Sequence, residues 1–234
     1  MTGYTPGFPV ERLAGARRIT RPRSMARVDV FRVLLIRSGA TSWDETEHLS
    51  GQNDLPMCEE GLARFAISPE TVGSAKPRMV LSADDQASTQ SAAMVAKALG
   101  CKAKACPGLR DVDLGLWQGL RMEDIRERTP KIYKQWCDDP LSLNPPEGES
   151  LRSARARLID EMFRCIEKAA KGSKETNPAV AVVLRPIALA LVRSRLLDDP
   201  GLVCWSRMKA GPEFEWHLIP PQRVDSLREP AAVS

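Results

Sequence analysis

Two near-continuous apolar runs constrain the fold of this 234-residue chain more than any other feature. They are VDVFRVLLI at residues 28–36 and AVAVVL at residues 179–184. A strand without alternation of apolar and polar residues is typical of a parallel sheet covered on both faces. Segments with helical spacing separate these runs from each other and from a third, RMVLS, at residues 78–82. The alternation predicts a three-layer α/β/α sandwich with a mostly parallel central sheet.

Apolar spacing and helix-stop signals also predict the remaining elements. Residues 203–208 and 213–219 are candidate closing strands, antiparallel at a sheet edge, and residues 109–120 suit a loop or a short strand. Helices are expected over residues 59–67, 84–99, 122–136, 151–170 and 187–197, the last with Pro186 at its first position.

Positive charge is concentrated at the N-terminus. Residues 1–27 hold six arginines against Glu11 alone, whereas the whole chain has a net charge of +4. The rest of the chain is therefore nearly neutral. We expect a basic, extended or flexible arm over residues 1–27, one domain over residues 28–220 and a polar C-terminal tail over residues 221–234. The sequence shows neither a secretory signal nor an apolar run of membrane-spanning length, so we expect a cytoplasmic protein.

The cysteines and histidines limit the chemistry that is open to the chain. None of the six cysteines forms a C-x-x-C pair, so we interpret them as reduced, packing thiols and expect neither a zinc site nor a cofactor. The only histidines are His48 and His217. We expect His48 in a solvated loop, with contact to an anionic ligand as the alternative, and His217 in a structural role.

Ligands of parallel α/β sheets bind beyond the carboxyl ends of the strands. Here those ends carry Arg37-Ser38-Gly39, Ser82-Ala83-Asp84 and Arg185-Pro186. These segments are therefore the candidate site. The tryptophans Trp43, Trp117 and Trp136 are interpreted as packing residues, with a role in lining a ligand cleft as the alternative.

Five ordered blocks of the chain resemble the histidine phosphatase superfamily, the phosphoglycerate-mutase-like proteins. The resemblance covers roughly residues 28–220 and implies the fold of that family. The family's first strand ends in Arg-His-Gly, followed by Thr-x-Trp-Asn. The corresponding blocks here are VLLIRSGATSWD with GQNDLPMCEEGLARF, LSADDQASTQSAAMVAKALG, LRDVDLGLWQGL, PPEGES and VAVVLRPIALALV.

The chain departs from the family at the positions that carry its chemistry. The resemblance implies a histidine nucleophile, two arginines and a second histidine around the phosphate, with a carboxyl group as proton donor. Ser38 occupies the nucleophile position, Ala87 that of the second arginine and Arg185 that of the second histidine. Arg37 is retained, and Asp111 stands at the position of the acid. Both catalytic histidines are therefore absent.

The leading hypothesis is a catalytically inactive member with a binding, regulatory or assembly role. An anionic or phosphorylated small molecule, a protein partner or a second copy of the chain would be its partner; nucleic acid and membrane are not expected. One alternative is a weak phosphatase that uses Ser38, or a metal-bound water near Asp84, Asp85 and Asp111. Another is binding of nucleic acid or an acidic partner by the N-terminal arm.

The directions in which the Arg37 and Arg185 side chains point determine whether the site is open to an anion or closed. If both point into one pocket, together with Ser38 and Asp111 they form an anion-binding site. If Arg185 instead pairs with Asp111 or Asp84, the site is closed. The sequence leaves both possibilities open.

Overall fold

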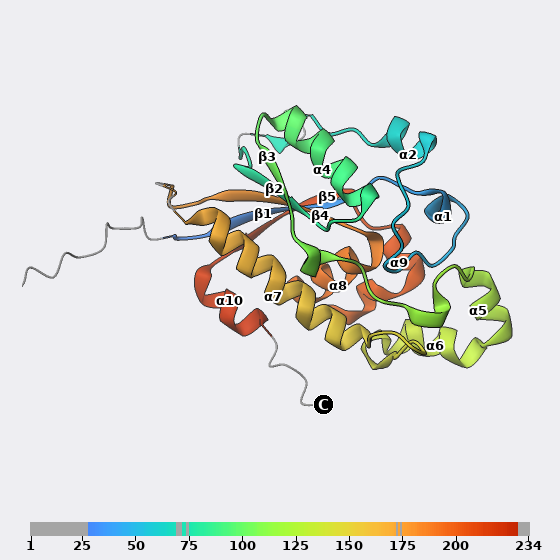
Figure 1. Cartoon of the computed structure of the whole chain (residues 1–234). Helices are drawn as coiled ribbons and strands as arrows, with labels where there is room; N and C mark the ends of the chain where they lie inside the picture. The colour runs from blue at the N-terminus through green and yellow to red at the C-terminus, as the bar shows by residue number, and fades with distance from the viewer. Residues whose placement is uncertain (1–27, 69–71, 74, 172, 174, 229–234) are drawn as a thin grey trace, which may run out of the picture.

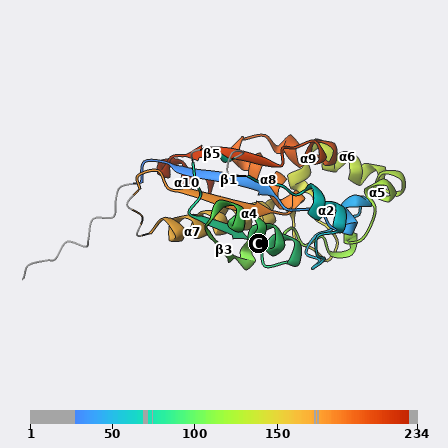
Figure 2. The same ribbon diagram turned by 90° about the horizontal axis from the view of Figure 1, so that it is seen from above.

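A five-stranded sheet forms the centre of the computed structural model, which describes residues 28–68, 72–73, 75–171, 173 and 175–228 (Figure 1). The strand order is β3-β2-β4-β1-β5, with β5 antiparallel to β1 and the other pairs parallel. Seen from above, β5 and β3 lie at opposite edges (Figure 2). The strands are β1 (Phe31–Arg37), β2 (Met79–Ser82), β3 (Lys102–Ala105), β4 (Ala179–Leu184) and β5 (Phe214–Ile219).

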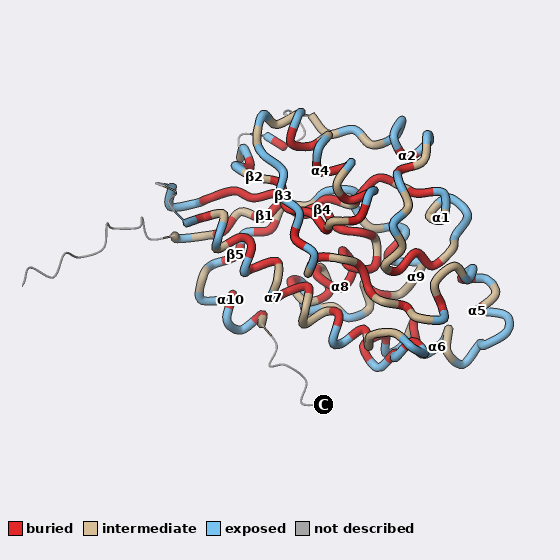
Figure 3. The backbone as a smooth tube through the Cα atoms, viewed as in Figure 1, coloured by how far each residue is buried: buried red, intermediate tan, exposed pale blue. Residues whose placement is uncertain are grey.

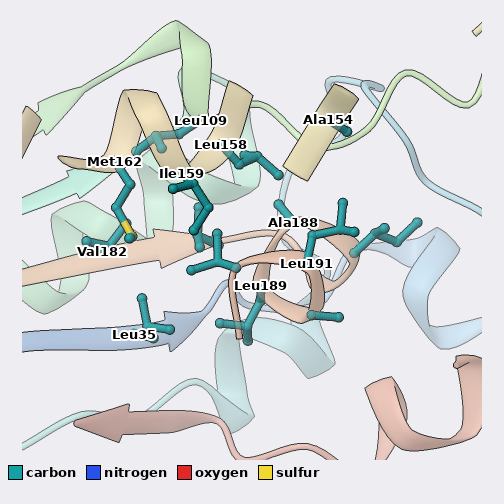
Figure 4. Close-up of a cluster of buried hydrophobic side chains, with 14 of the residues drawn as sticks. Leu35, Leu109, Ala154, Leu158, Ile159, Met162, Val182, Ala188, Leu189 and Leu191 are labelled. Atoms are coloured by element: carbon teal, nitrogen blue, oxygen red, sulfur yellow. The ribbon is translucent and has the colours of Figure 1, made fainter. Parts of the chain in front are cut away.

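Helices cover both faces of this sheet, as the apolar runs predict. On β1, Val33 and Leu35 pack with α7 (Leu151–Ala170) and α8 (Pro186–Leu196), and Figure 4 shows this cluster. The alternate residues Leu34 and Ile36 point to the other face, where they pack with α4 (Gln86–Leu99). The fold is therefore the predicted α/β/α sandwich.

The longer helices begin and end where local chemistry favours it. The Asp85 side chain accepts a hydrogen bond from the Ser88 N–H at the start of α4, and Gly100 ends that helix with φ +66°. Ser150 caps α7 in the same way, and Pro186 begins α8. The remaining elements are α1 (Ser42–Glu45), α2 (Glu59–Arg64), α5 (Met122–Arg128), α6 (Pro130–Asp138), α9 (Trp205–Lys209), α10 (Pro221–Leu227) and the 3-10 turns η1 (Pro107–Leu109), η2 (Gly115–Trp117), η3 (Pro140–Ser142) and η4 (Pro200–Val203).

Several expected elements differ in the structure. The helix expected over residues 122–136 is two helices, α5 and α6, because Pro130 cannot continue a helix. The strand expected over residues 203–208 is wrong: this segment contains the end of η4 and α9. The edge strand β3 was not predicted, since its sequence KAKA is short, carries no large apolar residue and has no buried face. The antiparallel edge strand near residues 213–219 is confirmed as β5.

The structure describes none of the expected N-terminal arm and only part of the expected C-terminal tail. The arm at residues 1–27 and the final residues 229–234 lie outside the described residues. Part of the expected polar tail forms α10, whose Val224 and Leu227 are buried against the core. Burial is concentrated in the sheet and the inner faces of its helices (Figure 3). Among the described helices, none combines the length and the apolar character that crossing a membrane requires.

Candidate functional site

The carboxyl ends of β1 and β4 bring two candidate residues together. Arg37 and Leu184 are register partners in this parallel pair, and the Ser38 N–H donates to the Leu184 carbonyl at 2.9 Å. Ser38 and Arg185, which follow these strands, are therefore neighbours. Both are buried, with exposed fractions of 6% and 3%.

The Arg185 guanidinium is bonded within the protein. Nη2 contacts both carboxylate oxygens of Asp44, at 2.8 and 3.1 Å. Nη1 donates to Ser38 Oγ at 3.3 Å and to the Gly39 carbonyl at 3.4 Å. Asp111 and Asp84 were the expected internal partners of Arg185, but Asp44 is its partner in the structure. The ion pair is largely shielded from water, because the Arg185 side chain is 4% exposed and the Asp44 side chain 19% exposed.

Asp44 is held in place by the turn that follows β1. Its Oδ2 accepts hydrogen bonds from the Thr41 N–H and hydroxyl, each at 2.7 Å, and Thr41 caps the Asp44 N–H in return. The family pattern Thr-x-Trp-Asn has an amide at this position, whereas this chain has Thr41-Ser42-Trp43-Asp44. The exchange of amide for carboxylate was the sequence signal for the missed partner, and it supplies the negative charge that Arg185 needs.

Asp111 acts as a helix cap in this structure. Its Oδ1 accepts the backbone N–H groups of Val112 at 2.9 Å and of Ala188 at 2.7 Å. Ala188 lies in the first turn of α8. Arg185, the residue before this helix, provides no side-chain cap. The carboxyl is 2% exposed and its Oδ2 has no hydrogen-bond partner. Burial raises the pKa of Asp111 to about 7, against the opposing effect of nearby Arg185.

Arg37 points to α9 instead of joining Arg185. Its Nη2 donates to the Met208 carbonyl and its Nη1 to the Lys209 carbonyl at the end of that helix. Burial lowers the pKa of Arg37, although Asp44 and Glu213 act in the opposite direction. The two arginines thus have different partners, and the expected forked anion site is not assembled in this conformation.

A cavity of about 370 Å³ lies beside the ion pair. Arg37, Ser38 and Asp44 are on its wall, whereas Arg185 and Asp111 are absent from the described residues that line it. Its other two cations are engaged, Arg64 with Glu45 and Lys209 with Glu47. Most of its apolar wall comes from the side chains Ile36, Phe65, Ile67, Trp205, Met208 and Phe214.

The position of the family's second arginine is filled by packing. Ala87 is fully buried in α4, one turn before Ser91. The Ser91 hydroxyl donates to the Ala87 carbonyl at 2.7 Å and accepts from the Gly39 N–H at 2.9 Å. Gly39 in turn packs so closely on Met57 that a Cβ there would lie 2.0 Å from the methionine methyl group. The residues described at this wall of the site, Ala87, Ser91, Gly39 and Met57, include no cation.

The three aspartates of the metal-water alternative have separate roles. Asp84 pairs with Arg110 at 2.5 Å, Asp85 caps α4, and Asp111 caps α8. Among the described residues, the potential metal ligands that cluster within 4.8 Å are Cys106, Glu161 and Cys165, a set that includes none of these aspartates. The geometry does not favour a metal-bound water at the candidate site.

The aromatic and histidine candidates have structural contacts. Trp117 and Trp136 stack with centroids 6.0 Å apart, and both are buried. Trp43 lies against His48, whose Nδ1 is 2.8 Å from the Thr46 hydroxyl. His217 is buried in β5 beside Glu215, and burial lowers its pKa. The described contacts of these residues agree with packing and loop roles.

Known proteins similar to this chain share its fold. It is 26% identical over 172 residues, 74% of this chain and 77% of the relative, to "Probable phosphoglycerate mutase GpmB" of Yersinia pestis (strain Pestoides F). The solved structure of mycobacterial glucosyl-3-phosphoglycerate phosphatase has a TM-score of 0.64 and 21% identity, covering 81% of this chain and 97% of that one. The Shigella flexneri alpha-ribazole phosphatase has a TM-score of 0.57 and 19% identity, covering 75% and 84%.

A family model confirms the relationship that the sequence blocks indicated. The model described as histidine phosphatase superfamily (branch 1) matches residues 33–209, which include both strand ends of the site and α9. The chain belongs to the histidine phosphatase superfamily.

Proposed function

We propose that this chain is a noncatalytic member of its superfamily. The observation that carries the proposal is the Arg185–Asp44 ion pair, which lies where the family's second histidine would face the phosphoryl group. In the family a phosphate would supply the negative charge beside this strand end. Here the Asp44 side chain supplies it from within the chain, and Ser38 Oγ completes the arrangement as a hydrogen-bond acceptor.

Ser38 lacks the activation that a replacement nucleophile requires. A serine hydroxyl becomes nucleophilic when a base within hydrogen-bond reach takes its proton. The partner of Ser38 Oγ is the Arg185 guanidinium, which has no acceptor, and the carboxyl of Asp111 is committed to the N–H groups of Val112 and Ala188. This arrangement favours the inactive hypothesis over the weak phosphatase that the sequence left as an alternative.

Hydrolysis of p-nitrophenyl phosphate tests the proposal. We expect the rate to equal the buffer background, and to lie about six orders of magnitude below that of a relative with both histidines, because loss of a covalent nucleophile has an effect of that size. The variants Ser38→Ala and Asp111→Asn should give the same background rate as the wild type. Turnover by the wild type that disappears in both variants would show instead that a phosphatase with a serine mechanism has been retained.

Anion binding at Arg185 should depend on the removal of its internal partner. Isothermal titration with millimolar inorganic phosphate should give no binding heat for the wild type, because Asp44 already occupies the guanidinium. Asp44→Asn keeps the size of the side chain and removes its charge, so this variant should bind phosphate. If the wild type binds phosphate as tightly as Asp44→Asn, the closed-site interpretation is wrong and the former active site still accepts anions.

A further inference from the structure

Two pairs of cysteines approach each other in the fold although they are far apart in the sequence. Cys106 and Cys165 have Sγ atoms 3.0 Å apart, and Cys137 and Cys204 have Sγ atoms 3.2 Å apart. None of these cysteines is in a disulfide. Both members of the first pair are buried, whereas both members of the second are partly exposed. An oxidant in solution can therefore reach the second pair more easily than the first.

The backbone segments of the exposed pair are held together independently of the thiols. Cys137 lies near the end of α6, and Cys204 immediately precedes α9. Trp136 precedes Cys137, and Val203 precedes Cys204. These two residues are joined by a hydrogen bond, in which the Trp136 indole N–H donates to the Val203 carbonyl at 2.9 Å. Trp136 is 1% exposed, so this bond is shielded from water. The two sulfurs are thus kept close by a fixed local geometry.

The two thiols of this pair differ in acidity. Burial raises the pKa of Cys204, but hydrogen bonds from Cys137, Ser206 and the backbone N–H groups of Ser206 and Arg207 outweigh it and lower the pKa overall. Burial, together with its hydrogen bond to Cys204, raises the pKa of Cys137 to about 11. Once Cys204 has lost its proton, Cys137 is the member of the pair that retains one to donate. A thiolate beside a protonated thiol is the arrangement that redox-sensing cysteines use.

In the buried pair, the surroundings oppose formation of a thiolate at Cys165. Burial raises the pKa of Cys165 to about 12, and its contacts with Cys106 and with the Glu161 carboxylate act in the same direction. Glu161 lies 3.3 Å from the Cys165 sulfur. Formation of a thiolate next to this carboxylate is unfavourable, so the pair provides an internal control of similar sulfur separation.

We propose that Cys204 and Cys137 form a peroxide-oxidisable dithiol site, with Cys204 as the attacking thiolate and Cys137 as the resolving thiol. The Cys204 sulfur attacks one oxygen of hydrogen peroxide; an S–O bond forms, the O–O bond breaks, and the leaving hydroxide takes a proton to become water. Cys137 then attacks the sulfenic sulfur, the S–S bond forms, and the oxygen leaves as a second water. Two thiols and one peroxide thus give one disulfide and two waters.

The disulfide would join the start of α9 to α6. Trp205, Met208 and Lys209 of α9 line the cavity beside the ion pair, and Arg37 bonds the carbonyls at the end of the same helix. Oxidation would therefore anchor the N-terminal end of α9, and with it this wall of the cavity. The loop that the new bond closes spans 67 residues, so we expect the Tm to rise on oxidation and to return after reduction.

Peptide mapping of the full chain after exposure to hydrogen peroxide tests the proposal. Trypsin releases Cys137 in residues 135–152 and Cys204 in residues 196–207, so their disulfide gives one linked peptide. Cys106 and Cys165 lie in other tryptic peptides, at residues 105–110 and 165–168. We expect the Cys137–Cys204 peptide to form first, while the Cys106 and Cys165 peptides remain free thiols.

Single serine variants separate the two roles. Cys137→Ser should leave Cys204 as a sulfenic acid that dimedone traps, whereas Cys204→Ser should leave Cys137 unmodified under the same treatment. Circular dichroism checks that both variants are folded, and the wild-type peptide map does not depend on them. The proposal is overturned if the Cys106–Cys165 peptide forms as fast as the Cys137–Cys204 peptide, or if peroxide leaves Cys204 reduced in the wild type.

Discussion

Replacement of Asp44 by alanine should lower the free energy of unfolding by about 3 kcal/mol, because the Arg185 charge would remain buried without its partner. The guanidinium is 4% exposed, and the remaining Ser38 and Gly39 oxygens are neutral acceptors. The value is placed near the lower end of the range for broken buried pairs because Asp44 itself is 19% exposed. Urea denaturation of the two proteins, with equal m-values, measures the difference.

A double-mutant cycle shows whether this loss comes from the ion pair. Arg185→Met removes the charge that Asp44 neutralises, so Asp44→Ala should cost much less in the Arg185→Met background than in the wild type. Glu123→Ala is the matched control, since the Glu123–Arg126 pair is more than half exposed on both sides and should contribute at most about 0.5 kcal/mol. Equal losses from Asp44→Ala in both backgrounds would assign the effect to the Thr41 turn instead of the ion pair.

The fold could be predicted from the sequence because its signals are local. β4 and α7 have the predicted bounds, since an unbroken apolar run and a capped amphipathic helix each show their limits in the residues themselves. β3 and α9 could not be predicted in this way. The exposed KAKA of β3 becomes a strand only through pairing with β2. The short α9, WSRMK, has only two apolar residues, too few to distinguish a helical spacing from that of a strand.

The proximity of Ser38 and Arg185 could be predicted, but their contacts could not. Parallel-sheet geometry places Ser38 and Arg185 side by side, because each follows a strand end in a register that the apolar runs define. The partner of Arg185 depends on how the turn at Thr41 folds back, and this tertiary arrangement, which brings Asp44 to Arg185, has no signal in the local sequence pattern. The cysteine pairs show the same limit, since Cys137 and Cys204 are 67 residues apart and meet only through tertiary packing.

The residues at the family's catalytic positions form a consistent set. Arg185 at the second-histidine position would by itself be an unpaired buried charge. Asp44 at the family's asparagine position removes that electrostatic penalty, and Ala87 removes the need for a second anionic partner near α4. Arg185 is therefore neutralised within the chain, which is what the proposed noncatalytic function requires.

Stability should also depend on pH through Asp111. Burial raises the pKa of its carboxyl from 3.8 to about 7 in the folded protein, whereas the unfolded chain releases this proton near pH 4. Between these values the folded state binds more protons, so its stability is largest below pH 4 and decreases as the pH rises to 7. With about 1.4 kcal/mol for each pH unit, the contribution lost across this window is about 4 kcal/mol.

Asp111→Asn isolates this contribution because the amide keeps an oxygen for the Val112 and Ala188 N–H groups but cannot ionise. Relative to this variant, the wild type should lose about 4 kcal/mol of unfolding free energy between pH 4 and 7 in parallel urea titrations. The exposed Asp198→Asn, at a position with φ +55° that asparagine tolerates, should follow the wild type. A constant difference between wild type and Asp111→Asn would mean that Asp111 stays ionised in this range; Arg185 would then stabilise two carboxylates, Asp44 and Asp111, rather than one.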